Sequence, residues 1–205
     1  LMEDAFDSDA DRTDALRRIR SQSGNLLDMI QAMLDINKVE AGGISIDATE
    51  FRLGELMTRM RGAIPRTWYK DGVDLAWESE GDDAVLRSDA DKIEIVLRNL
   101  VHNALKYTDR GEVRVRAAAI PGDRQVDFTV TDTGQGIPPD DLERIFQMFR
   151  HSASGPPRQG GVGLGLFLAR QLAAALGGTI RAESTLGKGS CFTLALPMRV
   201  SQMPE

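Results

Sequence analysis

The sequence predicts an α+β protein built as a two-layer sandwich, in which helices lie on a mostly antiparallel mixed sheet, and a long helix precedes this sandwich. Helical and strand-like segments alternate without the regular strand-helix-strand order of a parallel α/β fold. Two pairs of strand-like segments are separated by short turns, which is typical of β-hairpins. Residues 1–42 instead carry apolar side chains at helical spacing only.

The helical segment at the start of the chain has a narrow apolar seam. Its members fall on alternating three- and four-residue steps, and Ser23 occupies the one polar seam position. Such a seam is typical of a helix that pairs with another helix, although a single amphipathic helix packed on its own domain has a similar periodicity. The run EAGGISIDATE ends the pattern, so we place a domain boundary between residues 42 and 43. The seam residues are Leu16, Ile19, Leu26, Ile30 and Met33, with Leu27 and Leu34 at the margins.

The second domain, residues 43–205, is predicted to hold the sandwich and a short C-terminal tail. A period of 3.6 residues in the apolar pattern predicts its helices, and alternation of apolar and polar residues predicts its strands. The predicted helices are Leu53–Ala63, 89–107 and 164–176, and the predicted strands are 43–51, 73–78, 112–120, 125–131, 179–184 and 190–196, the last two joined by a turn at 187–189.

The composition excludes several classes of function. The single cysteine, Cys191, cannot form an internal disulfide, and two histidines are too few for the usual zinc cluster, which fits a reducing cytosol. No stretch is apolar enough to cross a bilayer, and a net charge of -6 gives no long-range attraction to nucleic acid. The acidic start without methionine is no signal peptide and suggests a piece of a longer polypeptide. We therefore expect a cytoplasmic domain that contacts neither nucleic acid nor membrane, within a protein that could itself be membrane-anchored.

Three polar residues share one face of the predicted helix 89–107. Asn99, Asn103 and Lys106 are spaced at i, i+4 and i+7, opposite an apolar face. An amide oxygen suits magnesium, which keeps several waters and takes further oxygens from nucleotide phosphates, while an ammonium offsets phosphate charge. A solvated polar face is the alternative interpretation.

The segment Asp132-Thr133-Gly134-Gln135-Gly136-Ile137-Pro138 directly follows a predicted strand. A carboxylate fixed at a strand end can accept a hydrogen bond from an exocyclic amine such as that of adenine, and the glycines let the backbone turn tightly beneath a flat ring. An ordinary turn also favours Asp and Gly for purely local reasons.

A glycine run at 160–166 opens a predicted helix, where bare backbone N–H groups form an anion site. Its G-x-G-x-G spacing is not that of a dinucleotide fingerprint, and Gly187-Lys188-Gly189-Ser190 lacks the Ser or Thr that follows the lysine of a P-loop. The stretch 150–159 is polar and rich in Gly, Pro and Ser. It predicts either a mobile lid, from which Arg150 or Arg158 reaches the terminal phosphate of a nucleotide, or an ordinary surface loop.

Four segments in order resemble the conserved boxes of sensor histidine kinases, within the superfamily that includes gyrase, Hsp90 and MutL. NLVHNALKYT resembles the asparagine box, DTGQGIP the first glycine box, RIFQMF the phenylalanine box and GGVGLGL the second glycine box, while TLGKGSCFTLALP is similar to the closing hairpin. The resemblance implies a Bergerat-type fold that binds ATP and Mg²⁺. Asn103 would ligate magnesium, Lys106 and Tyr107 would contact phosphates and ribose, and Asp132 would bind the adenine amine. The other residues that it assigns to the pocket and lid are Gly134, Gly136, Ile137, Phe149, Arg150, Gly161, Gly163, Leu164 and Gly165.

The front segment, RIRSQSGNLLDMIQAMLDINKVEAGG, is similar to the second helix of the family's dimerisation hairpin. The resemblance therefore favours the paired-helix interpretation and implies a second protomer as partner, together with a response-regulator receiver domain. In the family the phosphoaccepting histidine lies on the first helix of the hairpin, which would precede Leu1. Neither His102 nor His151 matches that position.

Asn99 separates kinases from ATPases within this superfamily. By the resemblance, gyrase-like and Hsp90-like ATPases carry a glutamate at this place, where it activates water, and an amide is a poor general base. Asn99, Asn103 and Lys106 are therefore the expected catalytic residues of an ATP-dependent protein-histidine kinase. A nucleotide-binding dimeric scaffold without kinase activity and an ATPase of the superfamily are the two alternatives.

Overall fold

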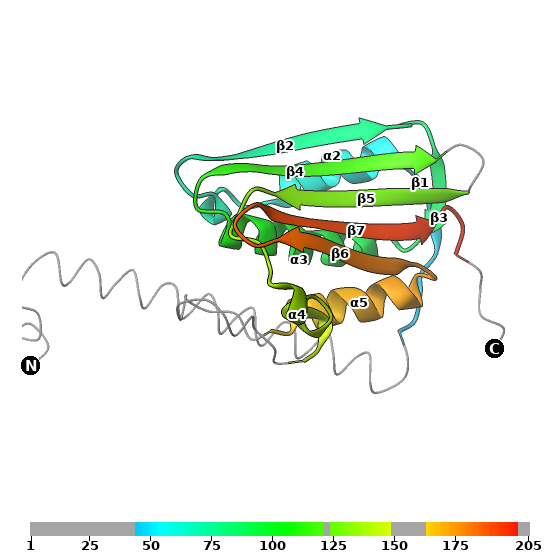
Figure 1. Ribbon diagram of the computed structural model, residues 1–205. Coiled ribbons are helices and arrows are strands. Elements are labelled where there is room, and N and C mark those ends of the chain that lie inside the picture. Colours follow the sequence, from blue (N-terminus) through cyan, green and yellow to red (C-terminus); the bar gives the residue numbers. More distant parts are fainter. Residues whose placement is uncertain (1–43, 121–123, 149–162, 201–205) are drawn as a thin grey trace, which may run out of the picture.

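The computed structural model describes residues 44–120, 124–148 and 163–200, and its helices α2, α3 and α5 cover one face of a five-stranded sheet (Figure 1). The strand order is β2-β4-β5-β7-β6, and a separate two-stranded sheet joins β1 to β3. The elements are β1 (Thr49–Arg52), α2 (Leu53–Ala63), η1 (Arg66–Trp68), β2 (Val73–Glu80), β3 (Val85–Ser88), α3 (Ala90–Tyr107), β4 (Gly111–Ile120), β5 (Gln125–Asp132), α4 (Pro139–Leu142), η2 (Arg144–Phe146), α5 (Gly165–Ala175), β6 (Thr179–Thr185) and β7 (Gly189–Pro197).

The sheet is antiparallel except for the parallel pair β2 and β4. Alternate residues of its central strands point toward the helices and are buried, such as Val113 and Val115 on β4 and Phe128 on β5. Since the strand period is two, the intervening residues form the opposite, more polar face. The predicted two-layer α+β sandwich on a mostly antiparallel mixed sheet is thus confirmed.

Helix α3 is the central helix of the covering layer and packs against both α2 and α5. Its apolar stripe includes Ile93, Leu97 and Leu100, each fully buried. The stripe recurs every three or four residues, as expected for a helix with one face in the core. The rigid placement of α3 matters because it carries the first group of candidate site residues.

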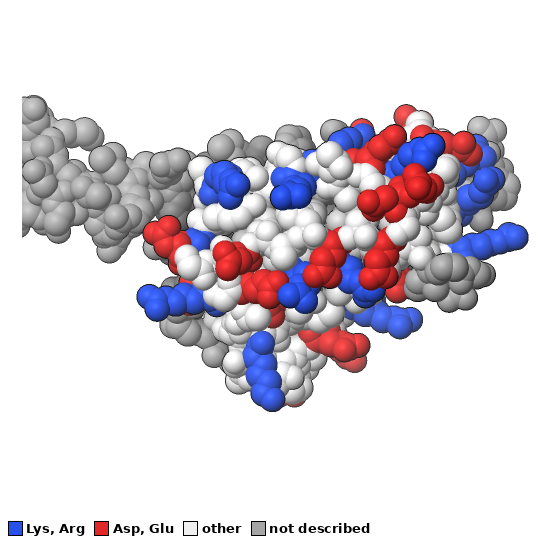
Figure 2. All heavy atoms as spheres, turned by 90° about the horizontal axis from the view of Figure 1, so that it is seen from above, with Lys and Arg blue, Asp and Glu red and all other residues white. Residues whose placement is uncertain are grey.

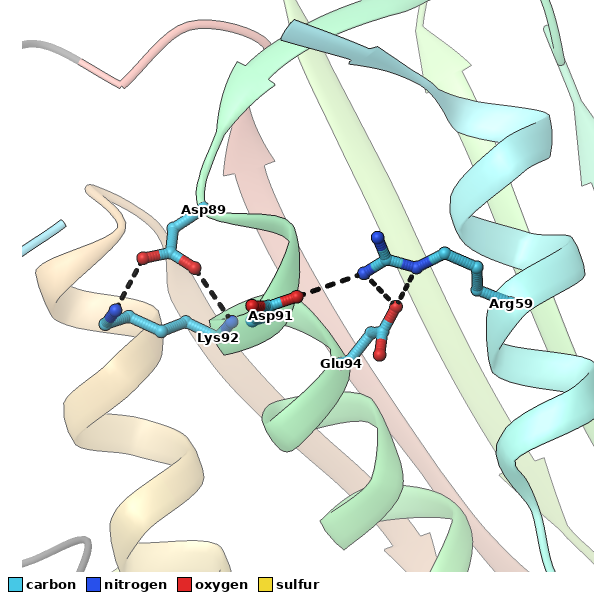
Figure 3. Close-up of polar contacts among 5 residues, drawn as sticks. All are labelled: Arg59, Asp89, Asp91, Lys92 and Glu94. Atoms are coloured by element: carbon cyan, nitrogen blue, oxygen red, sulfur yellow. Dashed lines mark hydrogen bonds and ion pairs between the residues drawn. The ribbon is translucent and has the colours of Figure 1, made fainter. Parts of the chain in front are cut away.

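The start of α3 is fixed by charged side chains (Figure 3). Asp89 caps the helix by accepting a hydrogen bond from the backbone N–H of Lys92 (3.1 Å), and its other oxygen accepts from the backbone N–H of Asp47 (3.0 Å). Arg59 of α2 reaches across to Glu94, with Nε to Oε1 at 2.5 Å, and to Asp91. A capping carboxylate satisfies N–H groups that have no partner within a helix.

One strand prediction was wrong in part, and one strand was missed. The strand predicted over 43–51 is observed only as β1, and residues 44–48 are not in a strand. The strand β3 was not predicted, because Val85 and Leu86 are a short apolar pair within a charged run, too short for a periodic signal. Its partner β1 lies more than thirty residues earlier in the chain.

The polar side of the sheet carries ion pairs between neighbouring strands. Arg114 of β4 pairs with Glu78 of β2 (3.2 Å), and Arg116 pairs with Glu80 (2.8 Å). Figure 2, which looks from above Figure 1 onto the side where β2 lies, shows basic and acidic side chains interleaved. Such exposed pairs contribute little to stability but keep a sheet face solvated.

The predicted helix of residues 1–42, its apolar seam and the proposed domain boundary lie outside the described residues. Within the described ranges, every helix is too short or too polar to cross a bilayer.

Candidate functional site

The C-terminal half of α3 carries the first three candidate residues, Asn99, Asn103 and Lys106. The Asn99 amide donates to the carbonyl of Ile95 (2.8 Å), which fixes its side chain along the helix. The half-buried Asn103 amide forms no hydrogen bond with any residue in the described part of the chain. Its oxygen is therefore available to a ligand, and a neutral amide oxygen fits magnesium.

The next residue on this helix end, Tyr107, lies beside Lys106, whose ammonium is 5.0 Å from the centre of the phenol ring. Burial raises the pKa of the Tyr107 hydroxyl above its ordinary value, because a phenolate would be poorly solvated there. The hydroxyl thus stays protonated at neutral pH and can donate a hydrogen bond.

Asp132 ends β5 and is the most strongly held carboxylate of the candidate site. Its side chain is buried, with 6% of the residue surface exposed. Oδ1 accepts from the backbone N–H of Gly134 (2.8 Å), and both the backbone N–H and the hydroxyl of Ser190 donate to the same carboxylate. Burial raises the pKa of Asp132, and these hydrogen bonds oppose the rise without cancelling it. The result is an oriented acceptor in a partly dry setting, suited to recognising an N–H group of a ligand.

Ser190 was missed by the sequence reasoning. It was placed in a strand after a hairpin turn, and only the pairing of β5 with β7, in which Asp132 faces Ser190, brings its hydroxyl to the carboxylate. The nearest available signal was the Gly-Ser step at the end of the glycine-rich turn.

The loop after Asp132 is fastened to the β6–β7 hairpin. Gly136 has φ of +69°, and a Cβ there would lie 2.2 Å from the carbonyl oxygen of Thr185, so the position requires glycine. The backbone N–H of Ile137 donates to Ser184 Oγ (2.8 Å), and that hydroxyl contacts the carbonyl of Gly189 (2.7 Å). The hairpin itself confirms the strand pair and turn predicted around 187–189.

The start of α5 approaches α3 closely. Leu164 is buried beside the predicted glycines Gly163 and Gly165, and a Cβ on Gly165 would lie 2.5 Å from Asn99 Oδ1. The N–H groups of the first turn of a helix have no intrahelical partner, so they can donate to an anion. The loop 132–137 also meets the end of α3, where Gln135 N donates to the Tyr107 carbonyl (3.3 Å).

The structure therefore brings together three predicted groups: the end of α3, the loop after β5 and the start of α5. Phe149, Arg150 and Gly161, together with the predicted lid 150–159, lie outside the described residues. A cavity of about 450 Å³ lies elsewhere, and it contains none of the predicted site residues. Its lining residues are Arg61, Gly62, Ile64, Arg66, Tyr69, Val73, Asp74, Leu75 and Trp77.

Helices on one face of a mixed sheet, with a buried carboxylate at a strand end facing a helix that presents amides and an ammonium, define the class of α+β nucleotide-binding domains. Residues 88–200 match the family described as histidine kinase-, DNA gyrase B-, and HSP90-like ATPase. The chain belongs to this family.

The similar proteins are sensor kinases. The chain is 34% identical over 189 residues to the autoinducer 2 sensor kinase/phosphatase LuxQ of Vibrio cholerae, a match that covers 90% of the chain and 22% of LuxQ. The crystal structure of full-length ShkA in complex with AMPPNP has a TM-score of 0.76 and 27% identity, covering 97% of this chain and 41% of ShkA. The catalytic domain of histidine kinase ThkA has a TM-score of 0.59 and 28% identity, covering 75% of this chain and 97% of that domain. The chain thus corresponds to less than a third of LuxQ and to well under half of ShkA.

Proposed function

We propose that this chain is the ATP-binding catalytic part of a sensor histidine kinase in a two-component system. It binds ATP with Mg²⁺ and transfers the terminal phosphoryl group to a histidine on the phosphoacceptor helix of the complete protein. A response-regulator receiver domain then takes the group onto an aspartate. The complete protein pairs with a second protomer through a dimerisation hairpin, whose second helix the sequence of residues 1–42 resembles. Because ATP is the phosphoryl donor, the domain works in the cytoplasm.

The observation that carries this proposal is the buried Asp132 carboxylate, held by Gly134 and Ser190 next to the end of α3. An acceptor fixed in this way suits the exocyclic amine of adenine. The Asn103 amide, which has no partner among the described residues, supplies an oxygen on the same side of the fold as Lys106. Base and phosphates are thereby assigned to opposite ends of one site.

The residues act mainly by positioning and by balancing charge. Asn103 would hold the metal through its amide oxygen, Lys106 would offset phosphate charge, and the start of α5 offers N–H groups to phosphate oxygens. Bound magnesium would neutralise charge that develops on the transferred group. Asn99, held by the Ile95 carbonyl, offers an amide where water activation would require a carboxylate, so attack by water is not promoted and the phosphoryl group is kept for the histidine.

Calorimetric titration of the chain with a non-hydrolysable ATP analogue and Mg²⁺ tests the site. We expect saturable binding by the parent, weaker binding by Asp132→Asn, and loss of the magnesium dependence in Asn103→Ala. Asp127→Asn is the matched control, because Asp127 lies on the same strand but pairs with Gln125 on the polar sheet face (2.6 Å). Binding that Asp132→Asn and Asp127→Asn weaken equally would contradict the assignment.

Incubation of the complete protein with radiolabelled ATP tests the reaction. An acid-labile phosphohistidine is expected, with little ADP beyond the amount released when that phosphohistidine forms. Rapid hydrolysis without phosphohistidine would identify an ATPase instead, and no binding by a folded parent would identify a scaffold.

A further inference from the structure

Lys70, on the loop before β2, reaches the C-terminal end of α3. Its ammonium donates to the carbonyl of Lys106 and to that of Thr108 (3.1 Å), and it pairs with Asp109 (3.2 Å). The last carbonyls of a helix have no partner within the helix, and a cation there also interacts favourably with the helix dipole. Lys70 therefore caps α3 from a separate segment of the chain.

Two other carbonyls at this helix end accept from backbone groups. Thr108 N–H donates to Ala104 (3.1 Å), and Gln135 N–H donates to Tyr107 (3.3 Å). Lys70 thus supplies the side-chain contribution to a junction that otherwise consists of the turn itself and the loop after Asp132. The carbonyl that it holds belongs to the residue whose ammonium is proposed to meet the phosphates.

The segment that carries Lys70 is itself anchored on α3. The ring of Trp68 stacks against His102, with ring centroids 4.4 Å apart, and Arg98 lies over the Trp68 ring at 5.9 Å. These contacts lie about one and a half and two and a half helical turns before the end of α3, so the Lys70 backbone is placed independently of its own ammonium. A side chain anchored in this way loses less freedom when it binds the helix end.

We propose that Lys70 is a positioning residue for nucleotide binding, which holds the last turn of α3 so that Lys106 and Tyr107 are preorganised for the phosphates and ribose. This inference rests on the function proposed above. Asp132 is held by Gly134 and Ser190 rather than by Lys70, so the adenine end of the site keeps its geometry when Lys70 is replaced. The phosphate end loses its geometry, because the last turn of α3 is no longer held by the Lys70 ammonium.

The test compares two ligands on the same variants: an ATP analogue with Mg²⁺ by calorimetry, and the base adenine, which lacks ribose and phosphates, by NMR titration. Lys70→Met, which keeps the length of the side chain without the ammonium, is expected to weaken binding of the ATP analogue about tenfold, the order expected for loss of a hydrogen bond from a charged group. The affinity of Lys70→Met for adenine is expected to stay at the parental level. Lys70→Arg is expected to restore binding of the ATP analogue, because a guanidinium also donates to carbonyls.

The control is Arg116→Met, which removes one cation and one ion pair from the polar sheet face. It is expected to bind both ligands as the parent does. Lys70→Gln replaces Lys70→Met if the latter does not fold, with the same difference between the ligands expected. Parental binding of the ATP analogue, an equal loss of both ligands, or no recovery with arginine would overturn the inference. A folded parent that binds no ATP analogue would overturn the proposed function first.

Discussion

The close approach of α5 to α3 predicts the effect of adding one methyl group at Gly165. The new Cβ would lie 2.5 Å from Asn99 Oδ1 and 3.4 Å from Asn99 Cγ. That first distance is about half an ångström shorter than Cβ atoms tolerate, so Gly165→Ala forces the Asn99 amide to move. The amide is the flexible end of its side chain, which makes movement of Asn99 less costly than a shift of either helix.

The cost of that movement follows from what Asn99 loses. Breaking its hydrogen bond to the Ile95 carbonyl costs about 0.5–1.5 kcal/mol, and a strained rotamer costs a similar amount. Alanine recovers about 0.5–1 kcal/mol in a helix. We therefore expect the free energy of unfolding to fall by only about 0–2 kcal/mol. The added methyl group and the displaced amide lie at the first turn of α5, whose N–H groups are proposed to bind phosphate, so affinity for the ATP analogue with Mg²⁺ is expected to fall about 5–30-fold, equivalent to about 1–2 kcal/mol.

Gly62→Ala is the matched control, because Gly62 lies in α2 and a Cβ there meets nothing within 4 Å. It is expected to stabilise the fold by about 0.5–1 kcal/mol and to leave binding unchanged. Urea denaturation and calorimetric titration of both variants provide the comparison. If Gly165→Ala is stabilised as much as Gly62→Ala and binds nucleotide as the parent does, the contact between α5 and Asn99 has no role in the site and the reasoning is refuted.

Four further predictions concern the loop after β5 and the core. Asp132→Asn is expected to weaken the ATP analogue about 10–100-fold, as when a charge-assisted hydrogen bond is lost, while the melting temperature stays close to the parental one; equal binding would contradict its role. Lowering the pH is expected to weaken parental binding in a range above that of an ordinary aspartate, because burial raises the pKa of Asp132. The effect of pH on stability has the opposite sign, because the folded state favours the protonated carboxyl. The contribution of Asp132 to stability is therefore complete at low pH and is lost as the pH rises through its folded pKa. A titration midpoint of Asp132 in the ordinary range of aspartate would contradict both expectations. Gly136→Ala is expected to lower the free energy of unfolding by more than about 2 kcal/mol, because of its positive φ and the Thr185 carbonyl at 2.2 Å; an unchanged urea midpoint would show that the turn can relax. Phe128→Ala, at a fully buried position, is expected to lower the free energy of unfolding by about 3–5 kcal/mol. The folded fraction is expected to keep its affinity for the ATP analogue.

Periodicity predicted the elements with long, regular patterns. The helix over 89–107 and the hairpin of β4 and β5 follow directly from spacing within one segment, and the structure confirms both. The strand β3 could not be predicted in this way, since its partner β1 lies far away in the sequence and its own apolar run is two residues long.

The candidate site likewise contains residues that spacing within one segment could predict and residues that only tertiary contacts bring to it. Asn99, Asn103 and Lys106 could be grouped because a helix repeats at a known interval, whereas the Ser190 hydroxyl reaches Asp132 only through pairing of β5 with β7. Lys70 carried no sequence signal, because its value depends on where a loop passes the end of another element. Residues that act through tertiary contacts are visible only once the chain is folded.

The last strand of the described residues, β7, lies inside the sheet, between β5 and β6. During synthesis, β4 and β5 can form their hairpin early, but the row of backbone groups on the far edge of β5 has no partner until residues 189–197 have left the ribosome. A chain cut short before Gly189 would leave that edge open beside Phe128, as a template for pairing with other chains. Residues 189–197 therefore close the middle of the sheet, and completion of this domain depends on synthesis of the chain through Pro197.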